Sequence, residues 1–121
     1  MNTPDRVQGL IVDLSETSHI ALLHIVSQAE QGLLDGAVAL LGDFVEAFAE
    51  MEAIAIRNFD VVNEPRFFTL NDALKRSLNL LIKCYEDRDE FRFVFEAKHN
   101  LLTVYTEWKQ ELTEIASDLD Y

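Results

Sequence analysis

Two Glu-x-x-His motifs are the parts of this chain best suited to chemistry. They run from Glu16 to His19 and from Glu96 to His99. On a helix, residues three positions apart share a face, so each motif would present a carboxylate beside an imidazole. Helical bundles that hold two metal ions use this motif twice, together with one inward glutamate from each of the other two helices.

The predicted helix faces argue against such a metal site. Glu16 and His19 fall behind the apolar stripe of the first predicted helix. Glu96 and His99 fall on the far side of the last helix from its stripe, and the third helix offers no inward glutamate. We therefore predict four solvated side chains, no metal site and no other cofactor.

His99 is the most exposed histidine in this arrangement, which raises phosphate relay as a second possibility. The chain resembles histidine phosphotransfer domains in size and helical shape only. That family usually places a lysine and a small residue just after the histidine on the same face, whereas residues 100–103 read Asn-Leu-Leu-Thr. We therefore predict an ordinary surface histidine.

Nucleophiles and acidic pairs give no stronger signal. Cys84 is the only cysteine, and its place at the edge of an apolar stripe predicts a buried, unreactive thiol. Glu50 with Glu46 or Glu52 could bind a divalent ion, as in all-helical nucleotide pyrophosphatases, but no second acidic pair is predicted to face them. There is no glycine-rich phosphate loop or nucleophile elbow. We predict no catalytic residue and no enzymatic activity.

The elements that position these residues are predicted to be helices. Apolar residues make up 49% of the 121-residue chain, while its 4 glycines and 2 prolines are few for the many turns of an all-β domain. Apolar residues recur at three- and four-residue steps. We predict one all-α domain over residues 1–121, an antiparallel up-down-up-down four-helix bundle with helices over about 4–31, 36–62, 70–86 and 89–118.

Three local signals set the early boundaries. Thr3-Pro4-Asp5 reads as a helix start, Gly32 and Gly36 bracket the first turn, and Thr69 to Asp72 resembles a capping box that opens the third helix. Residues 7–12 leave an alternative open, because Gly9 and the run after it could form a short strand before a later helix start at Asp13.

The last boundary rests on helical phase, since neither glycine nor proline stands between Tyr85 and Phe91. In one straight helix, the apolar stripe after Phe91 would point roughly 140° away from the stripe before Tyr85. One helix cannot bury both stripes against one partner. We therefore predict a turn near residues 87–89, with Asp87 and Glu90 as the cap of the fourth helix.

Net charge bears on the class of partner. The formal net charge is -12, and residues 1–65 hold 11 acids against two arginines, while residues 66–121 hold 11 acids against 8 bases. Such a field repels phosphate backbones and anionic lipids, so we predict no direct nucleic-acid or membrane binding and a basic protein as a compatible partner. Without a leader pattern or an apolar run of membrane length, and with one cysteine, we expect a cytoplasmic protein.

Two charged residues fall near predicted core stripes. Glu52 lies on the inner side of the second helix and Lys98 on that of the fourth. Burying either one alone would be costly, so each should reach solvent or a partner. We predict Lys75 or Arg76 as the partner of Glu52.

The first helix is apolar on more than one side. Val12, Ile20 and Leu23 point away from the stripe that packs inward, and Phe93 and Val104 form a weaker patch on the last helix. A helix that is apolar all round is usually buried all round, so we predict these five residues as an interface. The alternatives are a more central first helix, or scattered surface apolar residues.

These observations favour a non-enzymatic protein-protein interaction domain of the adaptor, immunity, chaperone or regulator type. We expect a homodimer formed through the first helix, with a basic protein as a further partner. Two other classes stay open: a small helical metal- or nucleotide-dependent enzyme, and an acidic nucleic-acid mimic that inhibits a DNA-binding protein.

Overall fold

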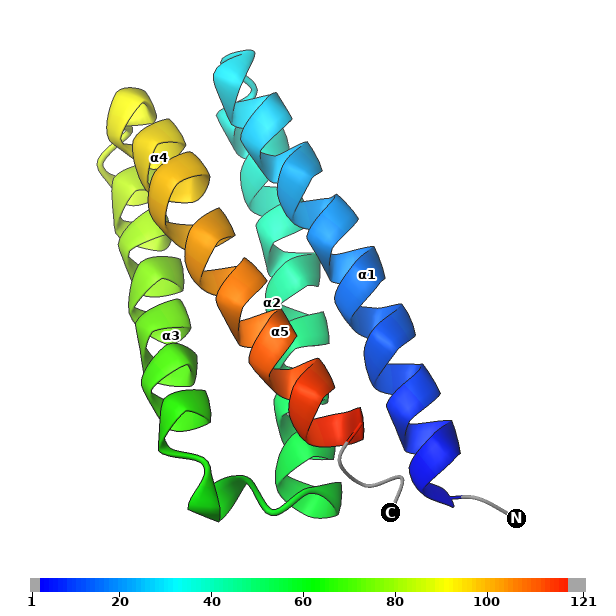
Figure 1. Cartoon of the computed structure of the whole chain (residues 1–121). Helices are drawn as coiled ribbons and strands as arrows, with labels where there is room; N and C mark the ends of the chain where they lie inside the picture. Colours follow the sequence, from blue (N-terminus) through cyan, green and yellow to red (C-terminus); the bar gives the residue numbers. More distant parts are fainter. Residues whose placement is uncertain (1–2, 118–121) are drawn as a thin grey trace.

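The computed structural model describes residues 3–117, and within that range it contains helices and no strand. Four rods run alternately in opposite directions (Figure 1), which confirms the predicted all-α four-helix bundle. Residues 7–12 are helical, so the strand alternative is wrong, and Asp118, the predicted end of the last helix, lies outside the described residues. The elements are α1 Thr3–Glu30, α2 Leu34–Asn58, η1 Val61–Asn63, α3 Pro65–Glu86, α4 Glu90–Glu96, η2 Ala97–Leu101 and α5 Leu102–Ser117.

A cluster of aromatic rings forms the middle of the core. Trp108 and Tyr105 of α5 are fully buried, and Phe44, Phe48 and Phe67 close around them from α2 and α3. The Tyr105 and Phe44 rings meet edge to face with centroids 5.2 Å apart, a geometry that aromatic pairs favour. One core therefore joins three of the four rods, and α1 completes it with Ile11, Leu22 and Ile25.

The turns at the upper end of the bundle in Figure 1 share one backbone conformation, in which a residue with positive φ ends the helix, but the residue type differs between the two turns. Gly32 has a φ of 78° and ends α1, while Leu33 N–H donates to the Gln28 carbonyl. Arg88 has a φ of 54° and ends α3, while Asp89 N–H donates to the Cys84 carbonyl. Glycine takes this left-handed conformation freely, whereas arginine does so at a cost of about 1–2 kcal/mol.

One predicted helix cap and one predicted helix start are wrong. The cap of the fourth rod is Asp89, whose carboxylate accepts the Arg92 N–H at 3.1 Å, and not Asp87. Helix α3 begins four residues before the predicted capping box, with Pro65 in its first turn. Because Thr69 lies inside the helix, its hydroxyl donates to the Pro65 carbonyl one turn earlier. Proline suits the first turn of a helix, since its φ is already helical and it lacks an N–H that would need an acceptor.

The fourth rod of the bundle consists of α4, η2 and α5, and η2 is a wide π turn between the two α-helices. A π turn holds one residue more than an α turn, so it rotates everything before it by roughly 100° relative to everything after it. The rotation buries Phe93 completely and leaves Phe91 83% exposed. In an uninterrupted α-helix the two phenylalanines would lie the other way round, with Phe91 in the buried apolar stripe and Phe93 outside it, as the apolar periodicity predicts.

Candidate interaction surfaces

Three of the predicted interface residues lie on the outer face of α1. Val12, Ile20 and Leu23 are 40%, 57% and 46% exposed, although the opposite face of the same helix is fully buried. Glu16 lies among them, and its carboxylate meets the Lys109 ammonium of α5 at 2.7 Å. That contact holds the pKa of Glu16 below its ordinary value, through the hydrogen bond first and the charge of Lys109 second.

The other two predicted interface residues do not form a surface. Phe93 is fully buried, and Val104 is half-buried against the core. The π turn explains the error for Phe93, because it turns that side chain inward. The exposed aromatic residues of this rod are instead Phe91 and Phe95, and the Phe95 ring packs on His99 with centroids 4.8 Å apart.

Helix α1 also reaches the length and apolar character of a membrane span. The most apolar 18-residue window within Arg6–Glu30 has a mean hydropathy of 1.3, and 33% of that window is buried inside the bundle. Core helices of globular proteins reach similar values, and α1 supplies Leu22 and Ile25 to the core. The expectations of no membrane contact and of a cytoplasmic location stay predictions.

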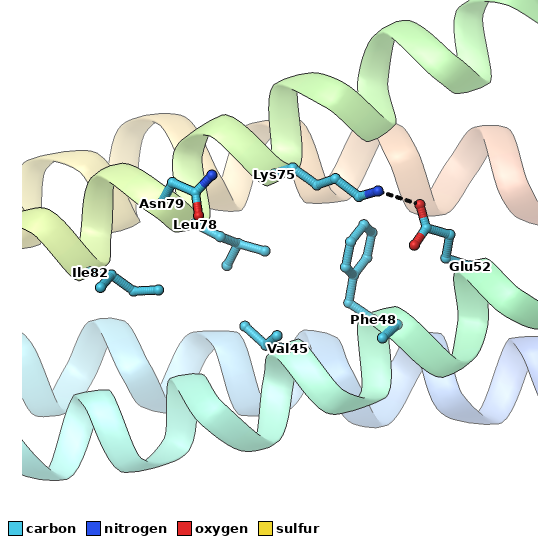
Figure 2. Close-up of a pocket in the computed structure, with 8 residues that line it drawn as sticks. Val45, Phe48, Glu52, Lys75, Leu78, Asn79 and Ile82 are labelled. Atoms are coloured by element: carbon cyan, nitrogen blue, oxygen red, sulfur yellow. Dashed lines mark ion pairs between the residues drawn. The ribbon is translucent and has the colours of Figure 1, made fainter.

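A groove lies between α2 and α3 (Figure 2). Its volume is about 280 Å³, and Figure 2 shows Val45 and Phe48 of α2 opposite Leu78 and Ile82 of α3. Ala49 and Asn79 also line it. Helices α2 and α3 approach each other less closely than α1 and α2 do, and the short side chains at Val45 and Ala49 leave the space between them unfilled.

One end of the groove is closed by the pair of Glu52 and Lys75. The Lys75 ammonium lies 2.7 Å from the Glu52 carboxylate, as the dashed line in Figure 2 marks. The predicted pairing of Glu52 with Lys75 is therefore confirmed. Burial raises the pKa of Glu52, but hydrogen bonds from Lys75 and Asn71, together with the charge of Lys75, hold it below the ordinary value.

A chain of hydrogen bonds fixes the Glu52 carboxylate from behind. The Trp108 indole N–H donates to the Asn71 side-chain oxygen at 3.1 Å, and the Asn71 amide donates to Glu52 at 2.6 Å. Because the indole can only donate, it sets the orientation of the buried Asn71 amide. The carboxylate is thus held from the core side by a contact that does not involve Lys75.

A second polar contact joins α2 and α3 nearer the first turn. The Asp35 carboxylate accepts from the Tyr85 hydroxyl at 2.7 Å and from the Arg88 guanidinium at 3.0 Å. These bonds, with the charge of Arg88, hold the pKa of Asp35 below its ordinary value. We call the Glu52 contact and the Asp35 contact the two clasps, since each joins an acid of α2 to donors on the α3 side.

The two Glu-x-x-His motifs are not brought together as a metal site. Within residues 3–117, no three His, Cys, Asp or Glu side chains converge on one point. His19 is half-buried with its ring against Tyr105, and its Nδ1 is buried without a hydrogen-bond partner, so its predicted solvation is wrong. His99 is exposed, as predicted.

Glu96 is the main surprise among these motif residues. It is 7% exposed and accepts hydrogen bonds from the Ser77 hydroxyl and the Asn100 amide, each at 2.7 Å. The prediction of a solvated Glu96 is therefore wrong, again because the π turn rotates α4 inward. Ser77 and Asn100 are donors that a buried carboxylate requires, and no sequence pattern had marked them.

Two further predicted side chains can be placed. Cys84 is buried, as predicted, and burial raises the pKa of its thiol. Lys98 is exposed, and its ammonium lies 2.9 Å from Glu30 of α1.

Comparison with known proteins identifies a family. Residues 9–111 match the domain of unknown function DUF8042. The chain belongs to this family. The matched DUF8042 region contains the outer face of α1, both walls of the groove and both clasps. No curated protein and no solved structure matches the chain.

Proposed function

We propose that this DUF8042 domain is a non-enzymatic protein-interaction domain that self-associates through the outer face of α1. The observation that carries the proposal is the exposure of Ile20 and Leu23, 57% and 46%, near the middle of a helix whose other face is fully buried. Exposed apolar side chains clustered on one face of a helix are typical of a surface that another protein covers.

The local charges on this face permit a second copy as its partner, although the net charge opposes the approach of two copies. Each copy carries a net charge of -12, so close approach is generally unfavourable. Glu16, which stands between Val12 and Ile20 on this face, is already paired with Lys109. A twofold axis near Ile20 would bring the same apolar residues of two copies together without adding an unpaired carboxylate at Glu16.

The experiment compares two double variants that add the same charge. In Ile20→Glu/Leu23→Glu the carboxylates stand on the outer face of α1, and in Ile56→Glu/Ile82→Glu they replace exposed apolar residues of α2 and α3. Sedimentation equilibrium across a concentration series should show a dimer for the parent chain and the α2–α3 variant, and a folded monomer for the α1 variant. A parent chain that is monomeric at all concentrations contradicts the proposal.

A further inference from the structure

The groove between α2 and α3 has the dimensions of a helix-binding site. It extends over residues 45–52 and 75–82, about two helical turns or roughly 12 Å. An amphipathic helix bound in a groove inserts apolar side chains spaced three, four and seven residues apart, which cover about that length. Ile82 is 43% exposed at one end, and Ile56, four residues beyond Glu52, is 58% exposed past the other. Apolar surface therefore lies at one end of the groove and again beyond the Glu52–Lys75 pair.

The charges around the groove select the chemistry of the occupant. On the α2 side the groove is acidic: this helix carries five acids, Asp35, Asp43, Glu46, Glu50 and Glu52, against the single base Arg57. Helix α3 instead carries four bases against two acids, so the acids that would attract a basic partner lie mainly along α2. Glu46 lies one turn from Ala49 on the groove side, and Glu86 lies one turn from Ile82. Both are exposed, and neither takes part in an ion pair found in the described part of the chain.

Glu52 is a preformed site for a cation. Asn71, which Trp108 orients, holds the carboxylate from the core side, and Lys75, whose side chain is 49% exposed, covers it from the groove side. A lysine or arginine of a partner could replace the Lys75 ammonium without disturbing the hydrogen bonds behind the carboxylate. Lys75 would then return to solvent, where its charge is hydrated.

We propose that the α2–α3 groove binds a basic amphipathic helix of a partner protein. The apolar side chains of that helix enter between Val45 and Ile82, and one of its basic side chains takes the place of Lys75 on Glu52. This inference deepens the proposed function by naming the chemistry of a partner, and it uses a different surface from the outer face of α1. A second copy is disfavoured here, because its net charge of -12 would face the acids of α2.

Trp108 provides the readout, since it is the only tryptophan. Its ring packs on Phe48, a wall of the groove, with centroids 5.0 Å apart, and its N–H leads through Asn71 to Glu52. The full chain is titrated with a synthetic four-turn amphipathic helix made of leucine and lysine, while Trp108 fluorescence is followed. A second peptide with every lysine replaced by glutamate tests the role of charge. The lysine peptide should change the emission and bind, and the glutamate peptide should do neither.

Two matched pairs of variants locate the binding. Ala49→Phe fills the groove without changing charge, and Ala39→Phe makes the same change on an exposed part of α2 outside it. We expect Ala49→Phe to weaken binding about tenfold or more and Ala39→Phe to leave it within about twofold. Lys75→Met should strengthen binding more than Lys83→Met, because both remove one positive charge from α3 but only Lys75 competes for Glu52.

Each other result has a definite meaning. Equal affinity of Ala49→Phe and the parent chain, or equal gains from Lys75→Met and Lys83→Met, overturns the groove as the site. Tight binding of the glutamate peptide overturns the basic partner. A loss of self-association in Ala49→Phe would assign the groove to a second copy instead. Peptide binding retained in Ile20→Glu/Leu23→Glu, whatever its oligomeric state, separates this inference from self-association through α1.

Discussion

The contact between α1 and α5 and the contact between α2 and α3 are built in opposite ways. Between α1 and α5, the Tyr105 ring is completely buried, and its hydroxyl donates to the Ser15 carbonyl at 2.8 Å. The ion pair of Lys109 with Glu16 covers the outside. Between α2 and α3, the polar contacts are the two clasps, and the apolar side chains between them leave a groove open to solvent.

The difference shows how one bundle can combine a rigid side with an open one. A large aromatic side chain brings α1 and α5 together through buried apolar area. The clasps fix α2 and α3 through charge and hydrogen bonds, which set a spacing but supply little apolar contact. The α1–α5 contact should therefore contribute most to the free energy of unfolding, while the α2–α3 contact leaves a surface free for binding.

The largest expected effect is on the α1–α5 contact. Tyr105→Ala should lower the free energy of unfolding by about 3–5 kcal/mol, because it removes a fully buried ring from a packed site. Phe48→Ala, at the wall of the groove, should cost less, since its neighbours already border open space. Urea denaturation followed by circular dichroism measures both. Equal losses would show that the two contacts contribute alike.

The next effect concerns the hydrogen bonds behind Glu52. Asn71→Ala should lower the free energy of unfolding by about 1–3 kcal/mol, because it leaves the buried Trp108 indole N–H without its acceptor. Asn79→Ala, an exposed amide that lines the same groove, is the control and should stay within about 0.5 kcal/mol. Similar losses in both variants would rule out a stabilising role for the Trp108–Asn71–Glu52 chain.

A smaller effect is the pH dependence of the Glu52 clasp. The pKa of Glu52 is lowered in the folded chain, so the clasp stabilises fully above the ordinary value of 4.5 and loses this contribution as the pH falls through the folded pKa. Glu52→Gln should be less stable than the parent chain at neutral pH, and this difference should vanish in acid. Glu50→Gln, an exposed acid of the same helix, should show no such change. A difference that stays constant with pH would contradict the lowered pKa.

The smallest expected effect of all, that of Phe91→Ala, tests the rotation imposed by the π turn when it is set beside the large effect of Phe93→Ala. Phe91→Ala should change the free energy of unfolding by less than about 0.5 kcal/mol, because its ring is 83% exposed. Phe93→Ala, only two residues away, should cost about 3–5 kcal/mol. Thermal melts of the two variants are sufficient. Interchanged effects would restore the arrangement predicted from periodicity.

Much of the fold follows from local rules, and so does part of the site. Apolar spacing and turn residues predict four helices, and the inner position of Glu52 next to a helix with Lys75 predicts their pairing. The exposure of Ile20 and Leu23 follows from the phase of α1 alone. These features depend on residues close in sequence or on one regular helix.

The remaining features depend on departures from regular geometry or on packing between rods. The π turn changes the faces of Phe93 and Glu96, and no residue type within η2 announces it. The turn at Arg88 lacks the glycine that usually marks a positive φ. The groove depends on the distance between α2 and α3, which results from the whole core and not from any short pattern.

The π turn has a consequence for how the fourth rod can be shortened. The buried positions Phe93, Ala97, Leu101 and Tyr105 lie four residues apart along the chain. From Tyr105 onward, the steps between buried positions alternate between three and four residues. Deleting His99, which is exposed, would turn the series into steps of four and three, the seven-residue repeat of supercoiled helices. The fourth rod should therefore tolerate this single-residue deletion by becoming an uninterrupted helix. The deletion would give protein engineers a version of the domain with a straight final rod.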